Sequence, residues 1–283
     1  MSKQLDFGEA MAQWANRNPT ISGLVLIGSR AHPDADLFLR ADAHSDWDFQ
    51  VIAAKPKLFK NASWAKGISG FELRAYAVRT AIIGGVPKVN AVFSGAEADF
   101  VIIPTISARL LRLCMALGLH KKEGRVRRHV QDLAEVIRPG WRFLKGGERW
   151  GRLYQQAVDD VPDPRLSDED LCHLAEGFVC DYIWIARKIA RGELRAAQRM
   201  LFRELLEVNL TLLHQLRQRR GQPSFTKARR LENVADKSEL ESVTLEATFE
   251  ASMLQNALEK SAATLQGLMA TLVGDAWKWP DIT

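Results

Sequence analysis

The sequence predicts an α/β protein in two parts: an amino-terminal mixed sheet covered by helices, and a carboxy-terminal helical bundle. Short apolar runs bounded by glycine, proline or acidic residues occur between residues 21 and 103, which is typical of strands. Beyond residue 106 such runs give way to long segments with apolar residues at helical spacing. The chain has 283 residues, 47% of them hydrophobic, which is enough for a substantial core.

The amino-terminal part is expected to begin with a helix at residues 5–16, where apolar residues recur at helical spacing. The expected strands cover residues 21–27, 47–53, 71–83, 88–93 and 98–103. Residues 94–97 have the sequence Ser-Gly-Ala-Glu, a turn signal, so the last two strands are predicted to form a hairpin. The sheet is therefore expected to be mixed.

Beyond residue 106 the chain is predicted to be helical. The expected helices cover residues 106–119, 126–137, 168–191, 193–219 and 239–273. Ser167 is a suitable N-cap for the third of them, because Asp170 stands at the third helical position. Proline and glycine punctuate residues 138–165, so we place the boundary there, with residues 1–138 as one domain and 139–283 as the other.

The composition is that of an ordinary globular protein. No apolar stretch reaches the roughly 18 residues of a membrane-spanning helix, and the first residues lack a signal-peptide pattern, so we expect a cytoplasmic protein with no membrane partner. Cys114, Cys172 and Cys180 lack the spacing of a zinc site and are interpreted as buried thiols. Trp184 is interpreted as a core residue. The net charge is +5, and the basic clusters either attract a nucleotide or nucleic acid or are solvated helix faces.

The most informative segment is Gly28-Ser29-Arg30, at the end of the first expected strand. A glycine turn at a strand end exposes backbone N–H groups, and a helix that starts there directs its N-terminus towards an anion. Gly28 and Ser29 are therefore interpreted as a phosphate cradle. Arg30 pairs with phosphate, braces a carboxylate or forms a surface salt bridge; the sequence leaves these alternatives open.

Three aspartates stand at the starts of two later strands. Asp46 and Asp48 share one side, because residues i and i+2 of a strand point to the same face. Asp99 begins another apolar run, and it is expected to complete a metal site or to act as a general base. Carboxylate oxygens suit Mg²⁺, which takes further ligands from water and from a substrate's phosphates. A phosphate cradle beside these carboxylates indicates phosphoryl or nucleotidyl transfer.

This pattern resembles the nucleotidyltransferase superfamily, whose signature is Gly-Ser, then Asp-x-Asp, then a carboxylate on a later strand. More fully, it resembles the aminoglycoside 6-adenylyltransferase (streptomycin adenylyltransferase) family. The matching segments are Gly28-Ser29-Arg30, Asp46-Trp47-Asp48, residues 99–104 (Asp-Phe-Val-Ile-Ile-Pro), a helical stretch at 178–197 and the Trp-Pro-Asp at 279–281. The chain departs from the family in a longer spacing between Ser29 and Asp46, and in Gly177-Phe178 where the family tends to carry Phe-Trp.

The resemblance implies a nucleotidyltransferase-type sheet in residues 1–138 and a helical acceptor-binding domain in residues 139–283. It implies transfer of AMP from ATP to a hydroxyl of a streptomycin-like aminoglycoside, with release of pyrophosphate and with Mg²⁺ on Asp46 and Asp48. Asp99 is then the base, a metal ligand or both. Arg187 aligns with a family lysine and is expected near the triphosphate, and Glu176 and Asp181 are candidate contacts for a cationic acceptor.

Two alternatives remain at this point. One is a nucleotidyltransferase with a different acceptor, such as another antibiotic, a protein side chain or tRNA, which the basic clusters would suit. The other is a catalytically silent nucleotide-binding module, against which the three intact aspartates count. The sequence leaves the acceptor, the choice of nucleoside triphosphate and the oligomeric state open.

Overall fold

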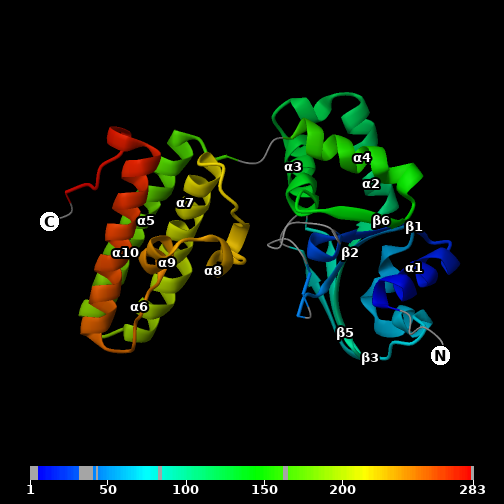
Figure 1. The fold of residues 1–283 in the computed structure, drawn as a ribbon, viewed down its shortest axis with the longest axis horizontal. Coiled ribbons are helices and arrows are strands. Elements are labelled where there is room, and N and C mark those ends of the chain that lie inside the picture. Colours follow the sequence, from blue (N-terminus) through cyan, green and yellow to red (C-terminus); the bar gives the residue numbers. More distant parts are fainter. Residues whose placement is uncertain (1–5, 32–40, 43, 82–84, 162–164, 282–283) are drawn as a thin grey trace. The chain divides into compact units, whose positions relative to one another are not determined.

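The structure is a computed structural model that describes residues 6–31, 41–42, 44–81, 85–161 and 165–281 (Figure 1). The chain divides into two units, Met1–Asp163 and Pro164–Thr283. The first contains a mixed sheet with helices and the second is helical, which confirms the predicted fold class. Within the described ranges, no helix combines the length and the apolar character needed to cross a bilayer.

Six strands form the sheet of the first unit, in the order β3-β4-β5-β2-β1-β6. Their bounds are β1 Ile21–Ile27, β2 Trp47–Ala53, β3 Leu73–Thr80, β4 Pro87–Phe93, β5 Ala96–Pro104 and β6 Trp141–Lys145. Neighbouring strands are antiparallel except β2 and β5, which are parallel. The predicted hairpin is the β4–β5 pair, in which Phe93 is opposite Ala96.

The apolar run of β1 is continuous because both of its faces are covered. Leu24 and Leu26 belong to one buried cluster, whereas Val25 and Ile27 belong to another. Alternate side chains of a strand point to opposite faces, so the two clusters lie on the two sides of the sheet. One strand thus anchors both cores of the unit.

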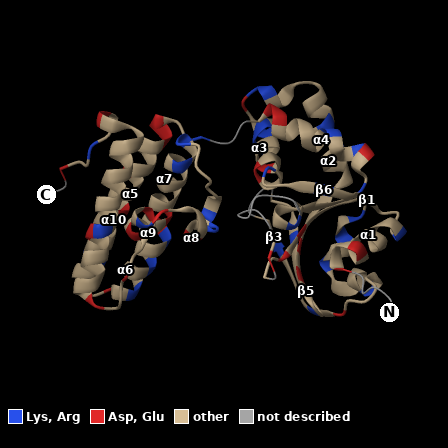
Figure 2. Cartoon of the chain, in the orientation of Figure 1, with Lys and Arg blue, Asp and Glu red and all other residues tan. Residues whose placement is uncertain are grey.

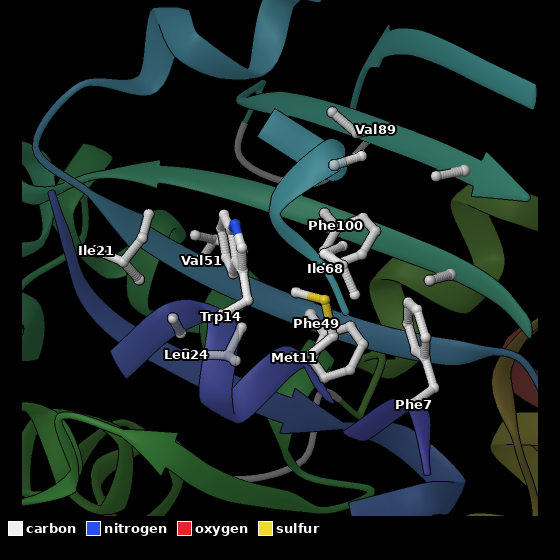
Figure 3. Packing of buried hydrophobic residues seen from close by; sticks show 14 of the residues in the cluster. Phe7, Met11, Trp14, Ile21, Leu24, Phe49, Val51, Ile68, Val89 and Phe100 are labelled. Carbon is white, nitrogen blue, oxygen red and sulfur yellow. The ribbon is translucent and has the colours of Figure 1, made fainter. Parts of the chain in front are cut away.

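Helix α1 (Phe7–Arg17) covers the first face of the sheet. Its start is fixed by a capping box, in which the Asp6 carboxylate accepts from the Glu9 N–H and the Glu9 carboxylate accepts from the Asp6 N–H. Phe7, Met11 and Trp14 recur at helical spacing and point onto the strands (Figure 3). Short 3₁₀ turns η2 (Pro56–Lys60) and η3 (Ala62–Gly67) extend this layer.

The second face is covered by three helices: α2 (Thr105–Ala116), α3 (Arg125–Ile137) and α4 (Gly147–Asp160). Trp150 and Tyr154 of α4 are fully buried in the cluster that contains Val25 and Ile27. The Tyr154 hydroxyl donates to Oε1 of Gln50 at 2.6 Å, which satisfies a polar side chain buried under the helices.

The boundary between the units falls after Asp163 rather than at residue 138, where the sequence analysis places it. The reason is β6, which pairs antiparallel with the outer edge of β1, with Ile27 opposite Trp141. Helix α4 follows and packs on the same face of the sheet as α3. The stretch from 139 onward therefore completes the α/β unit and is not the start of the bundle.

The second unit is a bundle of helices. Their bounds are α5 Asp168–Ala190, α6 Leu194–Met200, a π-helical turn η5 Leu201–Leu205, α7 Leu206–Arg219, α8 Leu231–Val234, α9 Lys237–Val243 and α10 Ala251–Leu272. Helix α10 packs against α5 and α7 (Figure 1). The predicted capping box at the start of α5 is present, with Ser167 as N-cap and Asp170 at the third position.

Trp184 of α5 and the three cysteines differ from their expected burial. Trp184 is 60% exposed, so its interpretation as a core residue is wrong. Cys180 is exposed, and Cys114 and Cys172 are half-buried, so the expectation of buried thiols is also wrong. Helical spacing shows which residues share a stripe, whereas burial depends on whether another element covers that stripe.

Candidate metal centre

The candidate site lies at one edge of the sheet, where β1 ends and β2 begins. The antiparallel register places Ile27 opposite Asp48, and the parallel register places Asp48 beside Asp99. One residue further along, Phe49 and Phe100 are neighbours in the same register and stack with ring centroids 5.3 Å apart. Because these rings are fully buried, a slipped register would lose their packing.

Asp46, Asp48 and Asp99 converge at this edge. Each offers one carboxylate oxygen, and the three oxygens lie within 4.8 Å of one another. Asp48 and Asp99 are half-buried, and Asp46, which precedes β2, is exposed. Opposite ligands of one cation lie about 4–5 Å apart, since the metal–oxygen distance is about 2.0–2.6 Å from Mg²⁺ to Ca²⁺. The three carboxylates therefore fit a divalent cation in both chemistry and spacing.

The alternation of β2 sets the direction of these side chains. Trp47 and Phe49 stack against each other in the cluster under α1, with centroids 6.0 Å apart. Asp48 lies between them in the sequence and points to the opposite face, together with Gln50. The carboxylates thus lie on the face of the sheet that α2, α3 and α4 cover elsewhere.

Asp99 has two partners on the neighbouring strand β4. The Asn90 side-chain amide donates to Oδ1 of Asp99. The Lys88 ammonium lies 2.5 Å from Oδ2, and the two side chains are 34% and 21% exposed respectively. Neither residue is among those predicted from the sequence. Their signal is the alternation of Lys88, Val89, Asn90 and Ala91, which places the polar pair on the face of Asp99 once the hairpin register is known.

Gly28 lies beside the carboxylates, and of the predicted N–H donors its own already has a backbone partner. Its N–H donates to the carbonyl of Gly140 at 3.0 Å, so this donor is already used. Its φ of +73° is in the left-handed region, and a Cβ at this position would lie 3.3 Å from Oδ2 of Asp48. Gly28 therefore permits a tight turn against a carboxylate. Ser29 is half-buried in the 3₁₀ turn η1 (Gly28–Ala31) that follows.

Arg30 holds the segment that carries Asp46. Its Nε donates to the carbonyls of Ser45 and Asp46 at 3.1 and 3.0 Å. Its guanidinium lies over the Trp47 ring, 4.5 Å from the centroid. These contacts with backbone carbonyls and an aromatic ring differ from the phosphate, carboxylate and surface roles considered from the sequence. They fix the approach of the chain to β2.

The other predicted site residues lie on α5 of the second unit. Glu176 and Arg187 are exposed, and Glu176 is within 3.3 Å of Nδ1 of His173. Asp181 is half-buried, and its pKa is raised above the ordinary value by desolvation and, secondarily, by the charge of Glu204. Basic residues are interspersed with acidic ones on the helices of both units (Figure 2).

No protein-family model matches this sequence, and no curated protein matches it. Among solved structures, the chain is similar to an aminoglycoside 6-adenyltransferase from Bacillus subtilis, with 13% identity, 98% of this chain and 94% of that chain covered, and a TM-score of 0.40. It is also similar to a nucleotidyltransferase-like protein from Exiguobacterium sibiricum, with 12% identity, 94% and 77% coverage, and a TM-score of 0.35. Both likenesses are weak and do not define the chemistry of this chain.

Proposed function

We propose that this chain is a nucleotidyltransferase that uses a divalent cation, with Mg²⁺ as the expected ion. The observation that supports this proposal is the convergence of Asp46, Asp48 and Asp99 within 4.8 Å, beside the tight turn at Gly28. Bound by Asp46 and Asp48, Mg²⁺ would neutralise charge on the phosphates of a nucleotide and on the pyrophosphate that leaves.

The proposed donor is ATP and the proposed acceptor is a hydroxyl of a streptomycin-like aminoglycoside. The hydroxyl gives its proton to Asp99, its oxygen forms a bond to the α-phosphorus, and the bond from that phosphorus to the bridging oxygen breaks, which releases pyrophosphate. A general base must lie within hydrogen-bond reach of the proton that it takes. Asn90 and Lys88 hold the two oxygens of Asp99 in a fixed direction for this step.

The remaining site residues have proposed roles of their own. Gly28 allows the backbone to lie close to the nucleotide, and Ser29 binds a phosphate through its hydroxyl. Arg30 positions Asp46 through the carbonyls that it contacts. Arg187 pairs with the triphosphate, and Glu176 and Asp181 bind the cationic acceptor; these three roles follow from the family resemblance alone.

The test is turnover of the full chain with ATP, Mg²⁺ and a panel of aminoglycosides, other antibiotics and tRNA. Pyrophosphate release and mass spectrometry of each acceptor are measured. We expect an AMP adduct on one aminoglycoside hydroxyl. Asp48→Asn should abolish transfer, and Asp99→Asn should lower kcat by about 10²–10⁴-fold. The matched control is Asp159→Asn, which changes an exposed aspartate on α4 and should leave the rate unchanged.

Each outcome of this panel identifies one alternative. An adduct on another antibiotic or on tRNA would keep the transferase and replace the acceptor. Nucleotide binding without any adduct would indicate a silent binding module. Full activity of Asp48→Asn would contradict the metal site itself. If Glu176→Ala and Asp181→Ala both leave the acceptor KM unchanged, these carboxylates do not bind the acceptor.

A further inference from the structure

Lys88 is an unusual neighbour for a carboxylate that is expected to bind metal. Its Nζ lies 2.5 Å from Oδ2 of Asp99, so a positive charge is already present at the edge of the carboxylate cluster. Resting on the proposed function, we propose that the Lys88 ammonium takes the place of a second metal ion. The centre then holds one divalent cation, on Asp46 and Asp48, when no nucleotide is bound.

The sheet register makes this contact a built feature of the fold. In the β4–β5 pair Asn90 is directly opposite Asp99, and Lys88 is opposite Val101. Residues two apart on a strand share a face, so Lys88, Asn90 and Asp99 all point to the same side. A lysine reaches its diagonal cross-strand neighbour easily. The pair is therefore set by the hairpin, whose turn lies between Phe93 and Ala96.

Partial burial strengthens the pair. The Lys88 and Asp99 side chains are 34% and 21% exposed, so water screens their attraction less than it screens a pair on an open surface. The other oxygen of Asp99 accepts from Asn90. The carboxylate is thus held from both sides before any cation arrives.

The charge of Lys88 and its position beside Asp99 limit the number of divalent cations that the centre can hold. Two-metal centres hold ions about 3.5–4 Å apart and use carboxylates that contact both. Here an ammonium occupies the Oδ2 side of Asp99, where a second ion would have to bind. A second divalent cation must displace Lys88 or tolerate the repulsion of its charge at close range. The first ion, on Asp46 and Asp48, can bind without breaking the Lys88–Asp99 pair.

The experiment counts Mn²⁺ ions bound to the full-length protein without nucleotide, by electron paramagnetic resonance of free Mn²⁺ and by calorimetry. Wild type should bind one ion per chain tightly. Lys88→Met should bind a second ion, or bind the first at least about 10-fold more tightly, because one positive charge has been removed. Lys88→Arg keeps the charge and should resemble wild type. The matched control, Lys57→Met, removes an exposed lysine of the same unit and should change nothing.

The outcomes separate this inference from the proposed function. Two equally tight ions in wild type, or unchanged number and affinity in a folded Lys88→Met, would overturn the role of Lys88 while nucleotide transfer could still be measured. Circular dichroism establishes that Lys88→Met is folded, and Lys88→Gln, which keeps a polar side chain, replaces it if it is not. Absence of any bound Mn²⁺ in wild type, together with absence of transfer, would overturn both.

Discussion

At the scale of single residues, Gly28 is restrained both by its backbone conformation and by its neighbours. Its backbone is in the left-handed region, and the space where a Cβ would lie is 3.3 Å from the Asp48 carboxylate. Its N–H is bonded to Gly140, which ties the turn to the residue just before β6. The sequence pattern located this glycine correctly, but the partner of its N–H depends on a strand that the pattern did not reveal.

Gly28→Ala should therefore lower both stability and metal binding. The left-handed conformation costs a residue with a Cβ about 1–2 kcal/mol, and the added atom pushes on Oδ2 of Asp48. Gly70→Ala is the matched control, because Gly70 also has a positive φ of +85° but nothing within 4 Å of its Cβ position. Thermal unfolding should show a similar loss in both variants, and Mn²⁺ affinity should fall only in Gly28→Ala. Equal affinity in the two would contradict the contact with Asp48.

A second residue-scale prediction concerns Tyr154 and pH. Burial raises the pKa of its phenol above the ordinary value of 10.0, so the folded chain keeps this proton at a pH where the unfolded chain has lost it. The contribution to stability is complete below about pH 10 and is lost as the pH rises above it. Urea midpoints between pH 8 and 11 should fall less steeply for Tyr154→Phe than for wild type. At pH 8 the variant should be about 1–3 kcal/mol less stable, because Gln50 loses its donor. If the urea midpoints of wild type and Tyr154→Phe fall equally steeply as the pH rises, the Tyr154 phenol does not cause the alkaline loss of stability.

At the scale of elements, helix α2 shows what periodicity can and cannot reveal. Its spacing predicts a helix correctly, but it carries two apolar stripes. Ala108 and Met115 are buried against the sheet, whereas Ile106, Leu110 and Leu113 are 72%, 60% and 56% exposed, and Leu117 at the C-cap is 66% exposed. The sequence cannot distinguish these two stripes, because both are apolar. They differ only in that the sheet packs against the stripe of Ala108 and Met115.

Substitutions on the two stripes of α2 should have very different effects. Met115→Ala removes a side chain that is 2% exposed and should cost about 2–5 kcal/mol. Leu113→Ala removes one that is 56% exposed and should change stability by no more than about 0.5 kcal/mol. Chemical denaturation of the full chain measures both. A large loss for Leu113→Ala would mean that its stripe is covered in solution.

At the candidate metal centre, too, the sequence pattern predicts some residues and not those whose role depends on how the strands pair. The three aspartates could be assigned from the sequence because each begins a recognisable apolar run, and strand alternation fixes the direction of Asp48. Lys88 and Asn90 could not be assigned, because their importance depends on the register of β4 against β5. Arg30 was expected to contact an anion, whereas its hydrogen bonds to Ser45 and Asp46 arise from the return of the chain after η1.

At the scale of the whole molecule, the main difference from the sequence-based expectation is the boundary between the units, which falls after Asp163 instead of at residue 138. β6 is only five residues long, Trp141–Lys145, and lies between glycines that resemble a linker. It is a strand because the outer edge of β1 is available to pair with it, and sequence periodicity does not record such a tertiary contact. The mixed sheet and the helical bundle were both predictable, because their apolar patterns change near residue 106.

A fragment of residues 1–163 should fold, whereas a fragment of residues 1–140 should not. The shorter fragment lacks β6 and α4, so it exposes the edge of β1 and removes Trp150 and Tyr154 from the core. Circular dichroism and a thermal melt of each purified fragment test this. A cooperative melt of residues 1–140 would show that β6 and α4 are dispensable for folding. It would then favour the unit boundary at residue 138.

The parallel pairing of β2 with β5 has a consequence for how an ion and the fold depend on each other. Asp48 and Asp99 are far apart in the sequence and meet only when these two strands are paired. The unfolded chain cannot hold the three carboxylates together, so a cation bound there is linked to the folding equilibrium. At 100 times its dissociation constant, such an ion would shift that equilibrium by about 2.7 kcal/mol. The fraction of chains open to proteolysis would then fall as the free concentration of the divalent cation rises.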